Sequence, residues 1–177
     1  MADFNKAVAV VLDHEGGLTD DKNDPGGITN FGIILEVLRR EGPLGDIDHD
    51  GDIDADDIRL LTIEDAKRIY NRQWWEQYSL GQINDQDQAT KIFDLMVNTG
   101  PTQGCLLAQR ALRAVGKGVK EDGKLGPKTL AMFNSVMPAY HLVAMRSEAA
   151  GFYRLISTIK PKLRDFIIGW LRRAYGC

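Results

Sequence analysis

The feature that most constrains the fold of this chain is the abrupt end of an N-terminal helical pattern at Glu15. Apolar residues recur at helical spacing before it, namely Phe4, Ala7, Val8, Val11 and Leu12. This spacing predicts an amphipathic helix over residues 3–15, with Asp3 as its N-cap. Residues 16–28 then carry four glycines and one proline and show no periodicity. A carboxyl group therefore stands at a helix end beside a glycine-rich segment.

Two interpretations of Glu15 follow from this position. A carboxyl group held against apolar surface can stay protonated near neutral pH, which is what a general acid for glycoside cleavage requires. The alternative is a solvated surface glutamate followed by a glycine C-cap. The segment that follows favours the first interpretation. Asp24 and Thr29 flank Gly26 and Gly27, whose tight turn brings the backbone close to whatever lies in a neighbouring cleft.

Several motifs along nearly the whole chain carry a family resemblance. They are HEGG (14–17), DPGGITNFGI (24–33), IYNRQWW (69–75), DGKLGPKTL (122–130) and GWLRRA (169–174). Together they resemble glycoside hydrolase family 108, the phage and bacterial N-acetylmuramidases with a C-terminal peptidoglycan-binding-like region. The family's catalytic glutamate corresponds to Glu15, and its D-x-G-G-x-T segment to Asp24, Gly26, Gly27 and Thr29. The order Glu, Asp, Thr is also similar to the triad of phage-type lysozymes, although the Asp-to-Thr gap is one residue shorter here.

The resemblance implies a mainly α, lysozyme-like helical fold with a small β flap. The flap is expected at residues 16–28, and helical spacing predicts a helix over 29–41 with Thr29 as a possible cap. The catalytic region would span 1–100. A helical peptidoglycan-binding-like region would span 101–177 and pack into the same body, since no linker or low-complexity segment separates the two.

The implied activity is hydrolysis of the β-1,4 bond between N-acetylmuramic acid and N-acetylglucosamine, which lyses bacteria. Glu15 would protonate the leaving oxygen, while Asp24, aided by Thr29, would activate water or stabilise charge. Retention or inversion depends on the carboxyl separation, about 5 Å against about 6.5–9.5 Å. Two alternatives are a calcium-dependent peptidoglycan-binding module and a lytic transglycosylase. Zinc hydrolase chemistry is excluded, because the three histidines form no H-E-x-x-H motif and the two cysteines are not paired in spacing.

A second feature is an acidic run at residues 46–57, which contains seven aspartates and fits the calcium-loop template. Gly51 stands at loop position 6, where the template turns sharply, and an aspartate replaces glutamate at position 12, as in dockerin-type loops. The predicted metal ligands are Asp46, Asp48, Asp50, Asp52 and Asp57. We expect bound Ca²⁺ to have a structural role, the shorter aspartate weakening binding or admitting Mg²⁺. The alternative is a solvated acidic run.

Three further residues are candidate substrate contacts. Trp75 belongs to a Trp-Trp pair, which is typical of a core but also of a sugar-stacking platform, and we expect one tryptophan on each face. Asp94 and Asn98 lie four residues apart on one face of a predicted helix over 89–100. They either orient a water or an N-acetyl group, or form a buried polar network that braces the helices. The sequence leaves both options open.

Composition limits the partners. The formal charge is −3, but without the seven aspartates of the acidic run it would be +4. That mild basicity suits an anionic wall polymer such as peptidoglycan and is too weak to indicate nucleic-acid binding. The start shows no signal-peptide pattern and the chain no apolar run near the ~18 residues that span a bilayer. We therefore expect a protein that is made in the cytoplasm and reaches the periplasm through a holin-type partner or cell lysis. We also expect a monomer with free thiols at Cys105 and Cys177.

Overall fold

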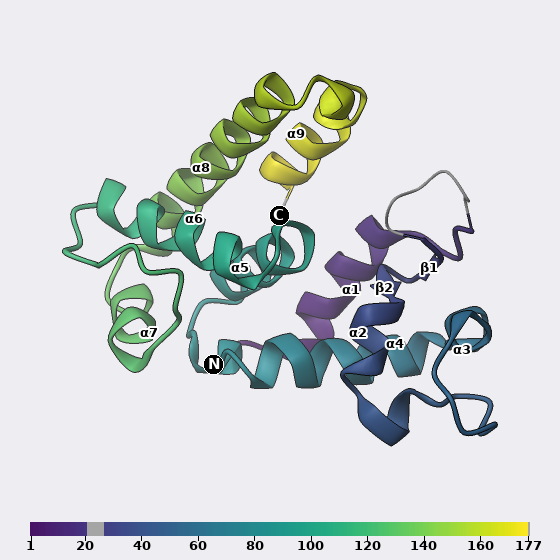
Figure 1. The fold of residues 1–177 in the computed structure, drawn as a ribbon. Helices are drawn as coiled ribbons and strands as arrows, with labels where there is room; N and C mark the ends of the chain where they lie inside the picture. The colour runs from purple at the N-terminus through teal and green to yellow at the C-terminus, as the bar shows by residue number, and fades with distance from the viewer. Residues whose placement is uncertain (21–26, 177) are drawn as a thin grey trace. The chain divides into compact units, whose positions relative to one another are not determined.

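The computed structural model describes residues 1–20 and 27–176, and this part of the chain is mainly helical (Figure 1). Its longer elements are α1 (Phe4–Glu15), α2 (Leu35–Arg39), α3 (Ala55–Leu60), α4 (Ile63–Tyr70), α5 (Gln86–Thr99), α6 (Pro101–Ala114), α7 (Pro127–Phe133), α8 (Pro138–Ile159) and α9 (Ile167–Gly176). The chain divides into two compact units. Unit 1 comprises Met1–Val10 and Trp74–Cys177, and unit 2 comprises Val11–Gln73.

Unit 2 contains a short hairpin where the sequence predicted the start of a helix. Strands β1 (Thr29–Asn30) and β2 (Ile33–Ile34) pair antiparallel, with Thr29 opposite Ile34. The two residues between them, Phe31 and Gly32, have φ angles of 51° and 75°. Positive φ at both central residues defines the turn whose twist matches that of a hairpin. The predicted helix over 29–41 is therefore wrong in its first half, and only α2 remains of it.

The β flap thus lies later in the chain than expected. Thr19 extends the hairpin by one bridge, since its backbone N–H donates to Thr29 O at 2.8 Å and its carbonyl accepts from Thr29 N at 2.9 Å. On the other side, the buried Asn30 amide donates to Ile58 O at 3.0 Å and Leu61 O at 3.3 Å. These bonds fasten the hairpin to α3.

Side-chain caps start the two helices that follow the acidic run. Asp54 and Asp57 form a capping box at α3, and Thr62 and Asp65 form one at α4. After α4 the helix continues as a π-helix over Asn71–Glu76. The 3₁₀ turn η1 (Gly42–Gly45) precedes the acidic run.

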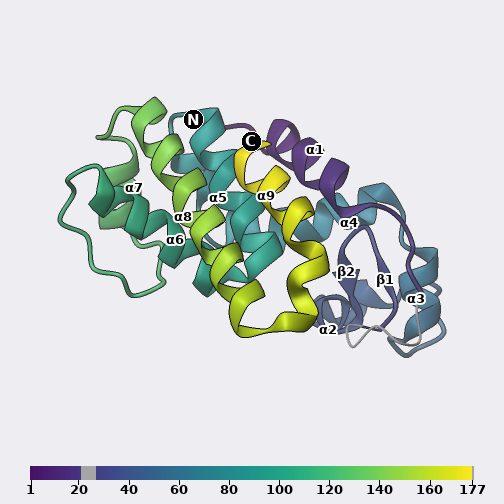
Figure 2. The same ribbon diagram turned by 90° about the horizontal axis from the view of Figure 1, so that it is seen from above.

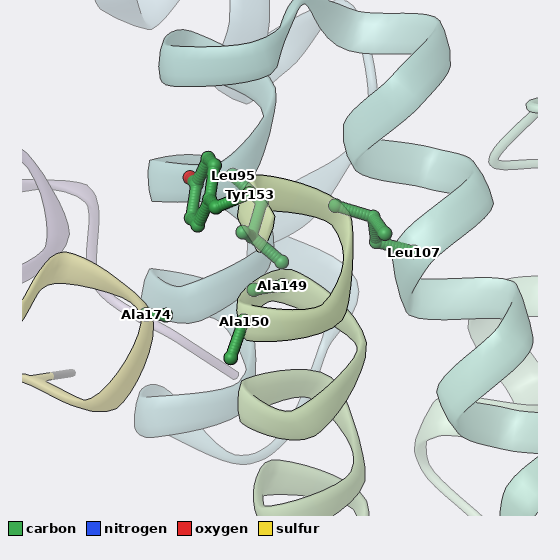
Figure 3. Packing of buried hydrophobic residues seen from close by; sticks show 6 residues of the cluster. All are labelled: Leu95, Leu107, Ala149, Ala150, Tyr153 and Ala174. Atoms are coloured by element: carbon green, nitrogen blue, oxygen red, sulfur yellow. The ribbon is translucent and has the colours of Figure 1, made fainter. Parts of the chain in front are cut away.

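Unit 1 is a helical body built around α5, α6, α8 and α9. A cluster of buried residues joins these four helices: Leu95, Leu107, Ala149, Ala150, Tyr153 and Ala174 (Figure 3). Helices α8 and α9 lie side by side in both views (Figures 1 and 2), connected by the 3₁₀ turn η4 (Pro161–Phe166). At Gly104 a Cβ would meet the backbone of Met96 at 2.7 Å, so glycine lets α5 and α6 approach closely.

Gly100, where the sequence pattern changes, lies inside unit 1. It ends α5 and precedes Pro101, which occupies the first turn of α6. Cys105 of α6 is buried with a free thiol, and burial raises its pKa to about 12. Cys177 lies outside the described residues. Across the described residues no helix has the length and apolar character needed to span a membrane.

Candidate functional site

Glu15 is the last residue of α1, and its carboxylate packs onto the hairpin turn of unit 2. A Cβ built on Gly32 would lie 2.5 Å from Glu15 Oε2 and 2.9 Å from Glu15 Cδ. The same point lies 2.7 Å from the hydroxyl oxygen of Tyr70, at the end of α4. The Glu15 carboxylate and the Tyr70 hydroxyl therefore share the hollow that the missing side chain of Gly32 leaves.

The hollow is built by three separate segments. Gly16, with φ of 71°, ends α1 immediately after Glu15. The turn at Gly32 requires glycine on two counts, because its φ is 75° and a side chain there would overlap the carboxylate. Tyr70 is fully buried, and its hydroxyl donates to Phe31 O at 2.9 Å. That bond fixes the turn against α4.

Sequence reasoning identified Glu15 but missed Gly32 and Tyr70. Both lie within motifs already noted, DPGGITNFGI and IYNRQWW. The available signal was the Phe-Gly pair, with β-branched Thr29 two positions before it and Ile33 directly after it, a weak hairpin indicator. The position of Tyr70 depends on how α4 packs, which no local pattern in the sequence reports.

The other predicted members of the glycine-rich segment are only partly described. Asp24 and Gly26 lie outside the described residues. Gly27 is exposed with φ of 68°, and a Cβ there would meet no atom within 4 Å. Thr29 lies on β1, where alternation along the strand places its side chain on the face opposite the buried Asn30.

The acidic run forms a loop with internal hydrogen bonds, and most of its carboxylates are exposed. Backbone N–H groups within the loop donate to its own carboxylates: Gly51 N to Asp46 Oδ2 at 3.2 Å, Asp50 N to Asp48 Oδ1 at 3.1 Å and Asp52 N to Asp50 Oδ1 at 3.1 Å. Each of two triplets, Asp46 with Asp48 and Asp50, and Asp52 with Asp54 and Asp57, brings one oxygen per residue within 4.8 Å of the others. His49, with φ of 63°, and Gly51, with φ of 103°, make the bends.

Position 12 of this loop is the best-anchored carboxylate. Asp57 is almost fully buried and accepts from Ile47 N at 2.6 Å and from Asp54 N at 2.8 Å. Burial opposes its ionisation, yet the backbone donors Asp54, Ile47 and Asp48 hold the pKa of Asp57 below its ordinary value. It therefore keeps its charge inside the loop.

The donor set fits a hard divalent cation. Asp46 Oδ1 is buried and has no hydrogen-bond partner among the described residues. The neighbouring groups also raise two pKa values. Desolvation and then the charge of Asp50 raise the pKa of the exposed Asp48, and the charge of Asp50 raises that of Asp52. Carboxylates that repel one another around an unpartnered buried oxygen are the chemistry expected where Ca²⁺ binds.

The loop is fastened to the rest of unit 2 at both ends. The buried Glu41 carboxylate, just before η1, accepts from Gln73 Nε2 at 2.7 Å, Arg72 at 3.1 Å and Arg68 at 3.3 Å. Arg39 Nε donates to Ile53 O at 3.1 Å. The loop position is therefore coupled to α2 and α4.

In unit 1 the contacts of Asp94 correspond to the bracing alternative rather than to substrate binding. Its carboxylate has no exposed surface and accepts from Arg173 Nε at 2.7 Å, with Lys91 Nζ at 3.7 Å. Lys91 Nζ donates to Arg173 O at 2.7 Å. Asn98 is partly exposed, and its Oδ1 accepts from Tyr153 at 2.8 Å. These bonds tie α5 to α8 and α9.

The two tryptophans do not divide between a core face and a cleft face. Trp74 and Trp75 are both buried, at 8% and 6% exposure. Trp75 packs edge-on against Phe4 at 5.8 Å and against Phe93 at 5.7 Å between ring centroids. Trp75 is therefore buried among core neighbours of unit 1 instead of standing on an exposed face, which corrects the expectation that one tryptophan lies on each face.

Comparisons with known proteins agree with the motifs. Residues 8–100 match the family described as Glycosyl hydrolase 108, and residues 103–175 match the family described as Predicted Peptidoglycan domain. Among curated proteins no significant match was found. Among solved structures, the chain is similar to SagA of Brucella abortus, with a TM-score of 0.72 and 24% identity over 98% of this chain and 94% of that chain. This likeness confirms the mainly α, lysozyme-like fold.

Proposed function

Because the chain belongs to the glycosyl hydrolase 108 family, it is a glycoside hydrolase of peptidoglycan, and we propose that it is a bacteriolytic N-acetylmuramidase. Its target would be the β-1,4 bond between N-acetylmuramic acid and N-acetylglucosamine. The observation that carries the proposal is the packing of the Glu15 carboxylate into the hollow at Gly32. The Glu15 carboxyl group is held between the end of a helix and a turn that requires glycine at position 32. A group held in this way is pre-oriented for proton transfer, and such positioning accelerates the step.

In the proposed reaction Glu15 donates its proton to the leaving oxygen as oxocarbenium character develops on the sugar. Asp24, aided by Thr29, supplies the counter-role of activating water or stabilising charge. The separation of the Glu15 and Asp24 carboxyl groups decides the stereochemistry, with about 5 Å giving retention and about 6.5–9.5 Å inversion.

The test is digestion of purified peptidoglycan by the wild-type protein and by Glu15→Gln, with products read by mass spectrometry before and after borohydride reduction. Glu15→Gln keeps the shape of the side chain but cannot donate the proton, so the rate should fall by about 10²–10⁴. Glu36→Gln, at an exposed glutamate of α2, is the matched control and should retain activity. Wild-type activity in Glu15→Gln would refute the assignment.

The products also separate the competing functions. Muramic acid ends that borohydride reduces establish hydrolysis of the proposed bond. Anhydro ends, which borohydride leaves unchanged, would reassign the chain to the lytic transglycosylases. Sedimentation with peptidoglycan without any soluble product would favour the calcium-dependent binding module.

The proposal includes a structural Ca²⁺ in the acidic loop, held by Asp46, Asp48, Asp50, Asp52 and Asp57. Support comes from the loop geometry and from the unpartnered Asp46 Oδ1. Its effect would reach the active site through unit 2. Asp57 belongs to the capping box of α3. The carbonyls of Ile58 in α3 and of Leu61, just after it, hold Asn30, and the turn after Asn30 carries the hollow for Glu15.

Calcium should therefore stabilise the protein and its activity together. At a concentration 100 times the Kd, a bound ion adds about 2.7 kcal/mol to the free energy of unfolding, or roughly 5–10 °C in Tm for a chain of this size. The measurement is Tm in millimolar Ca²⁺ and in EGTA, for the wild type and for Asp50→Asn. Asp165→Asn, an exposed aspartate in η4, is the control and should keep the full shift. An identical wild-type Tm in Ca²⁺ and EGTA would exclude the site.

A further inference from the structure

A turn between α6 and α7 is held in one conformation by a single buried side chain. Gln109, 1% exposed, makes four hydrogen bonds to it. Its Nε2 donates to Asp122 Oδ1 at 2.9 Å and Lys124 O at 3.0 Å, and its Oε1 accepts from Asp122 N at 3.1 Å and Gly123 N at 2.9 Å. The side-chain amide therefore bonds to both a backbone carbonyl and backbone N–H groups of the turn. These bonds hold the turn in its conformation before any ligand binds.

Gly123 sets the same turn against α6. Its φ is 68°, and a Cβ there would lie 2.7 Å from the methyl carbon of Thr102. The turn can therefore neither move toward α6 nor accept another residue without strain. A rigid surface on this side of unit 1 results.

The acidic side chains of the turn, Glu121 and Asp122, both have partners within unit 1. Glu121 pairs with Arg110 at 3.2 Å and with Arg113 on α6, and these two guanidinium groups hold the pKa of Glu121 below its ordinary value. Bonds from Gln109 and then from Lys124 N likewise lower the pKa of Asp122. Glu121 and Asp122 therefore both form ion pairs or hydrogen bonds within the protein.

Two lysines near the turn, Lys120 and Lys128, differ from these acids. A cavity of about 270 Å³ lies between the turn and α7, and its lining includes Val119, Lys120, Asp122, Lys128, Thr129 and Met132. Within the described part of the chain, Lys120 and Lys128 form no ion pair, and both are exposed. The charge of Lys120 helps to lower the pKa of Asp122, but the two exposed ammonium groups outnumber this one aspartate. The pocket therefore has a net positive charge, in a chain whose formal charge is −3.

We propose that this pocket binds a carboxylate of the peptide stems of peptidoglycan. The proposal rests on the proposed function and names the part of the polymer that the C-terminal region recognises. The ammonium groups supply donors for a carboxylate, and Thr129 supplies a hydroxyl. Val119 and Met132 suit small apolar side chains of a short peptide, whereas the lining holds no aromatic ring on which a sugar could stack.

The test uses the full-length protein and soluble probes, so that no digestion occurs during binding. The first probe is the disaccharide N-acetylglucosamine–N-acetylmuramic acid with its stem peptide, and the second is the same disaccharide without the peptide. Titration followed by amide NMR should shift residues 118–132 with the first probe only. Lys120→Gln/Lys128→Gln should raise its Kd about tenfold, because two exposed charge contacts are lost, while Lys162→Gln, on exposed η4, should leave it unchanged.

Equal affinity for the two disaccharides, or an unchanged Kd in the double variant, would overturn the proposal. Inorganic phosphate that binds the pocket as tightly as the peptide probe would also overturn it, since the site would then be a general anion site. Reducing ends released from intact peptidoglycan are measured in parallel. Their absence in the wild type refutes the muramidase, whereas their presence with no stem-dependent binding refutes the pocket alone.

Discussion

Substitution of Gly32 by alanine is the most direct test of how the carboxylate of Glu15, the proposed general acid, is positioned. The added Cβ would stand 2.5 Å from Glu15 Oε2, whereas ordinary contact begins at 3.4 Å. The carboxylate must therefore retreat by about 0.9 Å, or the turn must open. The added Cβ would also stand 2.7 Å from the Tyr70 hydroxyl oxygen, so that side chain would have to shift as well.

Backbone strain and overpacking together set how much stability Gly32→Ala loses. The left-handed backbone at Gly32 costs an alanine about 1–2 kcal/mol, and overpacking of a filled site costs a further ~1–3 kcal/mol. We expect the free energy of unfolding to fall by about 2–5 kcal/mol. Misplacement of a catalytic group by 1 Å can cost about 10²-fold in rate, so release of reducing ends should fall by about that factor in the protein that remains folded.

Gly42→Ala separates the two terms. Gly42 also has positive φ, 61°, and a Cβ there meets nothing within 4 Å. It should lose only the backbone contribution, about 1–2 kcal/mol, and keep its activity. The assays are thermal and urea unfolding together with reducing-end release per folded molecule. If Gly32→Ala matches Gly42→Ala in both stability and activity, the hollow does not position Glu15.

Two further predictions concern buried charges in unit 1. Asp94→Asn should lower the free energy of unfolding by about 3–5 kcal/mol, because Arg173 and Lys91 lose their buried counter-charge. The control is Asp87→Asn, at an exposed position of the same helix. A difference under about 1 kcal/mol between the two variants in urea unfolding would contradict the bracing role. Burial lowers the pKa of His141 to about 4, so the unfolded chain, with an ordinary pKa near 6.5, binds a proton that the folded chain does not. Stability should therefore fall as pH drops from 6.5 toward 4, by up to about 3 kcal/mol, and His141→Gln should flatten that part of the Tm-against-pH curve; parallel curves for the two proteins would argue against the linkage.

Several helices could be predicted from the sequence because their signals are local. Pro127 opens α7 in unit 1 and Thr62 caps α4 in unit 2, as their patterns indicate. The apolar spacing around Leu95 also corresponds to a buried helix. The hairpin at 29–34 was missed because apolar spacing over a short segment does not distinguish a helix from two brief strands. The positive φ of Phe31, a bulky residue, is held by the Tyr70 bond, which lies 39 positions away.

Sequence alone determined that a carboxylate stands at a helix end before a glycine-rich segment, that the chain is mainly helical, and that an acidic loop has the spacing of a cation site. These are properties of residue type and short-range order. Only the tertiary structure decided which polar groups are exposed and which are paired. Asp94 is committed to Arg173, 79 positions along the chain, and Glu15 is held by Gly32 and Tyr70. Burial and pairing depend on residues that packing brings together, so no local pattern could have placed Asp94 beside Arg173 or Tyr70 beside Gly32.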